Sequence, residues 1–295
     1  MKKFAKITGI VLFSLIGVLI VLFLLSRYVF REQVVDYLTE QQQNERVELL
    51  RNANPYAADT TQFRFTYTQD TLRAQALRIY FRLDTLLRAD VPTWDNAVAL
   101  AKFVAGNIPH ANQTVYPEKS NAIALWEYHL NIEPAFNCRL HSILLHELLL
   151  ASGIANRFVT CMPYDPEDND CHVVNIVWLP ELQKWAMIDS DMQAYITAPD
   201  QTPLSLEEMR RRYIAEEPMI IHRLLDTKND NYYASYWAKN LYWFQCWEQT
   251  GYDKEPSKEG RMIVLIPPGF EGFKMRDQGV KTSDPARFWA APIIE

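Results

Sequence analysis

Three residues with the side chains of a nucleophilic site stand at the ends of apolar segments. Cys138 opens a long apolar run, His172 opens a second apolar segment, and Asp189 closes a third. A thiol can attack a carbonyl carbon when an imidazole accepts its proton and a carboxylate orients that imidazole. We therefore predict a catalytic triad in the order Cys138, His172, Asp189.

The run that begins at Cys138 is typical of a buried helix. Leucine and isoleucine fill most positions from 140 to 150 and leave almost no polar face, and Gly153 follows as a C-terminal cap. Unpaired N–H groups and the helix dipole stabilise a thiolate at the first turn of a helix. This position favours the reactive form of Cys138.

Three predicted strands follow the helix, at residues 157–162, 172–179 and 185–189, with a polar acidic turn at 165–170 after the first. Side chains alternate along a strand, so His172 shares a face with Val174 and Ile176. If the last two strands pair, His172 and Asp189 lie side by side and face the start of the helix. Asp191 is the alternative partner for His172.

Other titratable groups in this region have structural interpretations. His141 lies on the same helical face as Cys138 and either packs there or biases the thiolate. His146 and Glu147 begin a zinc-protease H-E-x-x-H pattern, but Leu150 stands where the second ligand is needed. We expect neither a metal nor a cofactor.

Four features in this order resemble the transglutaminase-like superfamily, between Thr93 and Tyr195. They are a cysteine that opens a hydrophobic helix, Gly153 and Ile154 ahead of Arg157 in a turn into a strand, a histidine that opens the next strand, and Trp185 four residues before Asp189. The resemblance implies a papain-like α+β fold, in which the central helix that carries the cysteine packs on an antiparallel sheet. It also implies a Cys-His-Asp thiol acyl-transfer site at Cys138, His172 and Asp189, and so favours Asp189 over Asp191.

An acyl-transfer site also needs hydrogen-bond donors for the oxyanion that forms during attack. The backbone N–H of Cys138 is one donor. Trp126, Tyr128 and Gln113 are the upstream candidates for the second.

Composition limits the class of protein. The chain has 295 residues, 48% hydrophobic and 13% aromatic, which is enough for one good core with extensions. A net charge of −6 without a basic stripe argues against a nucleic-acid partner. The four cysteines are too few for a disulfide framework, although Cys161 and Cys171 flank the acidic turn and could pair.

The N-terminal segment predicts membrane association. Residues 7–25 are uncharged and about long enough to cross a bilayer, with Lys2, Lys3 and Lys6 in front. A cleaved signal peptide is the alternative, but no small-residue cleavage site follows the run. We favour an uncleaved single-pass anchor with the enzyme on the extracytoplasmic side.

We divide the chain into a cytoplasmic tip and anchor at 1–27, a helical stalk and N-terminal extension at 28–90, a catalytic core at 91–200 and a C-terminal extension at 201–295 that packs on the core. The expected helices outside the central one are residues 71–88, 94–106 with Thr93 as N-cap, and 206–217, and the last expected strand is 262–266. The aromatic segment 232–247 either packs against the core or forms a peptide- or glycan-binding surface.

The sequence therefore predicts a membrane-anchored thiol enzyme that forms an acyl-enzyme on peptide or protein amides. Whether water or an amine then takes the acyl group, making the enzyme a hydrolase or a transferase, is left open. The alternative from another class is a catalytically silent module that binds peptide or glycan at the cell envelope on the same fold.

Overall fold

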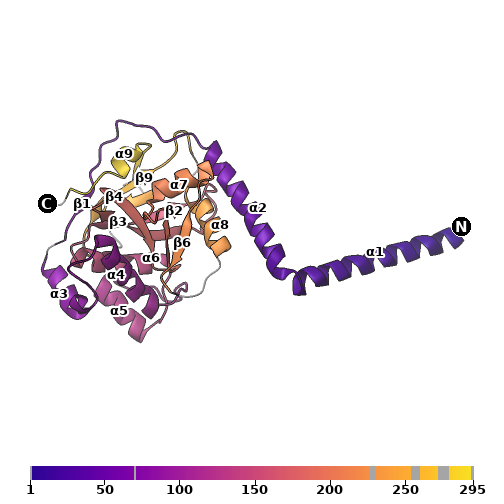
Figure 1. Cartoon of the computed structure of the whole chain (residues 1–295), viewed down its shortest axis with the longest axis horizontal. Coiled ribbons are helices and arrows are strands. Elements are labelled where there is room, and N and C mark those ends of the chain that lie inside the picture. The colour runs from indigo at the N-terminus through magenta and orange to yellow at the C-terminus, as the bar shows by residue number, and fades with distance from the viewer. Residues whose placement is uncertain (1, 70, 226–229, 254–259, 272–278, 294–295) are drawn as a thin grey trace.

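A mixed eight-stranded sheet forms the centre of the molecule (Figure 1). The computed structural model describes residues 2–69, 71–225, 230–253, 260–271 and 279–293, with side chains from residue 12 onward. The strand order is β10-β9-β7-β2-β3-β4-β5-β6, and all neighbours are antiparallel except β9 and β10. The strands are β2 (Asn156–Met162), β3 (His172–Leu179), β4 (Lys184–Asp189), β5 (Ala194–Thr197), β6 (Ile220–Arg223), β7 (Trp243–Trp247), β9 (Met262–Leu265) and β10 (Gly279–Thr282). The predicted antiparallel sheet is thus present, and one parallel pair at its edge makes it mixed.

Helix α6 (Cys138–Ala151) covers one face of this sheet. Its side chains are buried from Leu140 to its end, as the apolar run predicts, and Asn175 of β3 donates a hydrogen bond from its side-chain amide to the carbonyl of Ser142. The helices α3 (Leu72–Tyr80), α4 (Thr93–Asn107) and α5 (Ala122–Asn131) pack around it. Gly153 follows the helix with a φ of +76°, the left-handed conformation expected of a C-terminal cap.

The opposite face of the sheet carries the even-numbered side chains of β3. Arg157 of β2 projects here, fully buried, with its guanidinium 3.9 Å from the ring centroid of Phe65 and 4.7 Å from that of Trp185. Helix α9 (Pro285–Phe288) and the small parallel pair β1 (Thr66–Tyr67) and β8 (Gln249–Thr250) lie on this side. Because both faces are covered, β2 and β3 are buried along almost their whole length without alternation.

The aromatic segment 232–247 divides into two elements. Its first part lies in α8 (Asp230–Asn240), and its second part is β7, which pairs with β2 in the main sheet. The C-terminal extension therefore shares the sheet of the predicted core and does not form a separate layer. Helix α7 (Leu206–Ala215) begins at Ser205 with a complete capping box to Glu208.

Two helices precede this body, α1 (Lys2–Tyr28) and α2 (Arg31–Asn52). In the described part of the chain no single helix has both the length and the apolar character to cross a membrane; Leu12–Tyr28 meets the test only together with α2, across a bend of 85°. Residues 7–11 of the predicted anchor lie outside the residues whose side chains are described. The anchor stays a prediction. Figure 1 shows α1 extending away from the body, whereas the last turns of α2 pack on α7 and α8.

Two predicted boundaries near α4 are wrong. The helix expected at 71–88 ends at Tyr80, because Arg82 adopts a left-handed φ of 51° before a short 3₁₀ turn, η1 (Leu83–Thr85). Thr93 is the first residue of α4 and Pro92 is the N-cap. The Thr93 hydroxyl and backbone N–H both donate to Glu181, so Thr93 ties the helix start to the β3–β4 turn instead of capping it.

Candidate active site

The structure brings Cys138, His172 and Asp189 together. Nε2 of His172 lies 2.7 Å from Oδ2 of Asp189, and the Cys138 thiol lines the same cavity as the His172 ring and contributes to raising its pKa. Since Nε2 faces Asp189, Nδ1 is the nitrogen left for the thiol. The pair is almost fully buried, whereas Cys138 is half-buried.

The strands and the helix meet at this point for a geometric reason. Asn175 faces α6, so the alternation along β3 places His172 on the other face, together with Asp189 of the neighbouring strand. The thiol therefore meets the imidazole at the end of the sheet, where α6 and β3 both begin. Asn137 caps α6 by accepting a hydrogen bond from the N–H of Leu140, which fixes where the helix starts.

The electrostatics of the site favour a protonated His172. Burial lowers the pKa of its imidazole, but the charge and hydrogen bond of Asp189, together with the thiol of Cys138, outweigh burial and raise that pKa well above its usual value of 6.5. A protonated imidazole beside a thiol favours a thiolate–imidazolium pair. The arrangement can thus supply a nucleophile and a proton donor together.

Helix α8 lies outside the predicted catalytic core at 91–200 and contacts both His172 and Asp189. The hydroxyl of Tyr233 donates to Oδ2 of Asp189 at 3.3 Å. The rings of Tyr236 and Trp237 meet the His172 ring at centroid distances of 5.3 and 5.4 Å, with interplanar angles near 70°. The N–H of Met192 donates to the second oxygen of Asp189 at 2.9 Å. Together with His172, these two donors hold Asp189 in place.

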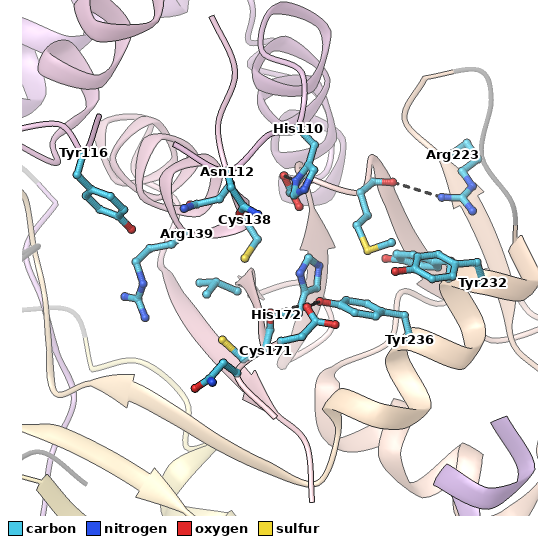
Figure 2. Close-up of a pocket in the computed structure, with 17 residues that line it drawn as sticks. His110, Asn112, Tyr116, Cys138, Arg139, Cys171, His172, Arg223, Tyr232 and Tyr236 are labelled. Carbon is cyan, nitrogen blue, oxygen red and sulfur yellow. Dashed lines mark hydrogen bonds and ion pairs between the residues drawn. The ribbon is translucent and has the colours of Figure 1, made fainter. Parts of the chain in front are cut away.

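A cavity of about 680 Å³ opens at the thiol (Figure 2). Its walls come from the loop before α5, the start of α6, the loop before β3 and helix α8. They are formed by His110, Asn112, Tyr116, Asn137, Cys138, Arg139, Asn169, Asp170, Cys171, His172, Val173, Asp191, Met192, Arg223, Tyr232, Tyr233 and Tyr236. A volume of this size suits a peptide segment or a drug-sized molecule.

Asp191 does not orient His172. Its Oδ1 lies 2.7 Å from Nδ1 of His110, whose side chain is 54% exposed in the cavity, and 3.6 Å from Nε2 of the buried His141. The hydrogen bond that His110 donates to Asp191 raises the pKa of His110, with burial opposing it. Burial lowers the pKa of His141, with Asp191 opposing it, and of the two histidines only His110 lies within hydrogen-bond distance of Asp191.

None of the three oxyanion candidates lines the cavity. Gln113 donates to the carbonyls of Ala135 and Ala111, and so ties the loops before α6 together. The Tyr128 hydroxyl is bound to Glu133 and to a backbone carbonyl, and Trp126 stacks on Phe103 with ring centroids 5.2 Å apart. Of the predicted oxyanion donors, the backbone N–H of Cys138 is the one whose residue lines the cavity.

Comparison with known proteins decides the family of this region. The family model of the transglutaminase-like superfamily matches residues 83–190, which include all three predicted triad residues. This segment is transglutaminase-like. The resemblance predicted from the sequence is confirmed.

The other comparisons add little to this assignment. A solved structure described as "a Putative Cysteine Protease from Cytophaga hutchinsonii" is 13% identical, and the match covers 55% of this chain and 55% of that chain, with a TM-score of 0.32. A TM-score this low does not establish a shared fold. No curated protein matches the chain at a significant level.

The remaining cysteines of the chain are free thiols, so Cys161 and Cys171 are not paired. Cys171 lines the same cavity as Cys138 of the transglutaminase-like segment, and burial raises the pKa of its thiol, with Cys138 adding to the effect. Cys161 and Cys246 are buried in β2 and β7. The two cavity cysteines therefore differ in environment.

His146 and Glu147 have structural partners. His146 Nδ1 lies 2.7 Å from the side-chain oxygen of Asn156, and the two carboxylate oxygens of Glu147 accept the N–H groups of Ala122 and Asp253. In the described residues no group of histidine, cysteine and acidic side chains has the arrangement of a metal site.

Sequence reasoning missed His110, Asn112 and Tyr233. The first two stand in a polar loop after α4, where a histidine and an asparagine near Pro109 were signals that we did not weigh. Tyr233 belongs to the aromatic segment, whose members we weighed as packing residues or a binding surface. Only the tertiary fold shows that the hydroxyl of Tyr233 donates to Asp189.

Proposed function

We propose that this chain is a thiol enzyme that acts on peptide or protein amides through an acyl-enzyme on Cys138. One observation carries the proposal: the half-buried thiol at the start of α6 lines the same cavity as His172, whose Nε2 lies 2.7 Å from the buried Asp189. A chain that only binds peptide has no need for these three groups together at the wall of a cavity.

The reaction follows from the geometry. The thiolate of Cys138 attacks the carbonyl carbon, a C–S bond forms, and the π electrons of the carbonyl move to its oxygen. When this intermediate collapses, the C–N bond breaks and the imidazolium of His172 gives its proton to the departing amine. Water or an amine then attacks the thioester, with neutral His172 accepting its proton, and the thiol is restored.

Mass spectrometry of the intact protein tests the proposal. We expect an activated ester such as p-nitrophenyl acetate to add one acetyl group to the wild-type chain within a fast burst of p-nitrophenol, with the adduct on Cys138. The Cys138→Ala variant should give no burst, and Cys171→Ala, which removes the other cavity thiol, should keep it. A wild-type chain without a burst that still binds peptide or glycan would support the silent binding module instead.

We further propose that residues 7–25 anchor the enzyme in a membrane with the catalytic body on the extracytoplasmic side. The uncharged run behind Lys2, Lys3 and Lys6 supports this, as does the exposure of the large apolar side chains from Leu12 onward. Extraction of membranes with alkaline carbonate should leave the full chain in the pellet and release a chain that begins at residue 28. Release of the full chain would contradict the anchor.

A further inference from the structure

His110 is held close to the nucleophile by backbone pairing. It forms an isolated parallel bridge with Phe136, in which the N–H of Ala111 donates to the Phe136 carbonyl at 2.8 Å and the N–H of Phe136 donates to the Pro109 carbonyl at 2.9 Å. Phe136 stands two residues before Cys138, so the segment of His110 runs beside the segment that leads into α6. Figure 2 shows His110, Asn112, Cys138 and His172 around the same cavity.

The histidine is also oriented by its surroundings, which favour its protonated form relative to a free imidazole. Asp191, whose side chain is 3% exposed, accepts a hydrogen bond from Nδ1 of His110 at 2.7 Å. This leaves Nε2 as the other possible donor of the ring. Asp191 lies just beyond the end of β4, whose last residue is Asp189. The fields of Asp191 and Asp189 favour the imidazolium form of His110, and the nearby His172 opposes it.

The three upstream candidates Gln113, Tyr128 and Trp126 do not line the cavity, whereas His110, Asn112 and Arg139 of the transglutaminase-like segment do, and of these His110 is the one whose ring is held by a buried carboxylate. Attack on a carbonyl creates a negative oxygen that is stabilised by donors fixed in place before the reaction. We propose that His110, held by Asp191, is this second donor and acts beside the Cys138 N–H. The inference rests on the proposed acyl-enzyme chemistry.

In this role His110 changes no covalent bond. When the C–S bond forms and the carbonyl π electrons move to oxygen, Nε2–H of His110 donates to that oxyanion, and it is released when the C–N or ester C–O bond breaks. The proton for the leaving group still comes from His172. The cavity thus contains two imidazole–carboxylate pairs with separate tasks, His172 with Asp189 for the thiol and His110 with Asp191 for the oxygen.

Two reactions of Cys138 separate these tasks. Alkylation by iodoacetamide displaces iodide and forms no oxyanion, whereas acylation by p-nitrophenyl acetate does. We expect His110→Ala to lower the rate of acylation by about 10²- to 10³-fold and to change the rate of alkylation by less than about threefold. Asp191→Asn should lower acylation in the same direction. His172→Ala should lower both rates.

Further variants keep the test decisive. His110→Gln retains an N–H donor without the charge, so its acylation rate should lie between those of wild type and His110→Ala. His222→Ala removes a part-buried histidine outside the cavity and should behave as wild type. The assignment would be overturned if His110→Ala lost acylation and alkylation equally, or lost no acylation. It would also be overturned if Asn112→Ala lost acylation selectively and His110→Ala did not. A wild-type chain that alkylates at Cys138 but never acylates would overturn the proposed function itself.

Discussion

Two carboxylates lie two residues apart, and each holds a different histidine. Asp189 bonds His172 and Asp191 bonds His110, both at 2.7 Å. The difference arises because Asp189 ends β4 and projects beside β3, whereas Asp191 stands beyond the strand and turns toward the loop before α5. Neighbouring residues of one type thus acquire different histidine partners from backbone direction.

The protonation of His172 should control how the rate of acylation depends on pH. The rate of acylation, kcat/KM, should follow a bell-shaped pH profile that rises as the thiolate–imidazolium pair forms and falls when His172 loses its proton. Asp189 raises the pKa of His172, so Asp189→Asn should move the alkaline limb to lower pH and reduce kcat/KM by about 10²- to 10⁴-fold. Asp191→Asn should leave the alkaline limb in place. Equal shifts of that limb in the two variants would show that the third member of the triad is assigned wrongly.

At the scale of elements, helix α8 supports the site from outside the matched segment. Its Tyr233 hydroxyl bonds the same oxygen of Asp189 that faces His172, and burial with the nearby Asp189 charge raises the pKa of Tyr233 well above 10, so it stays a donor throughout the working range. Helix α2 packs on α8, where Arg46 donates to the carbonyl and hydroxyl of Ser235. The helix that follows the predicted anchor is thus connected to the positioning of the triad.

Removing this hydroxyl tests the contribution of α8. Tyr233→Phe should lower kcat/KM by about three- to tenfold, the usual net worth of one hydrogen bond. The alkaline limb should move to higher pH, because an Asp189 with one donor fewer attracts the imidazolium more strongly. Tyr213→Phe is the matched control, since this buried hydroxyl also bonds α8, at the carbonyl of Ala234. A shift of the limb to lower pH in Tyr233→Phe would contradict the positioning role.

At the scale of the whole molecule, the sequence predicted the part of the fold whose signals are local. The apolar run after Cys138, the cap at Gly153 and the three strands that follow all have strong local patterns, and the structure contains them. The sheet of eight strands could not be predicted, because β7 joins it through pairings between residues some 80 positions apart in sequence, such as Cys161 with Phe244, and β9 and β10 are attached to the sheet through β7. His110 and Tyr233 reach the site through the same kind of distant contact.

The central claim is that Cys138 is an activated thiol. It is tested most directly by comparing the rate of alkylation of Cys138 with that of Cys171 in the same protein. Both thiols line the same cavity, but only Cys138 stands at a helix start against His172, whereas burial raises the pKa of Cys171. At pH 7 we expect iodoacetamide to label Cys138 at least about tenfold faster than Cys171, as read from peptide mass spectrometry, and His172→Ala to remove the difference. Equal labelling of the two cysteines in the wild-type chain, or a difference that persists in His172→Ala, would contradict the claim that this chain contains an activated thiol.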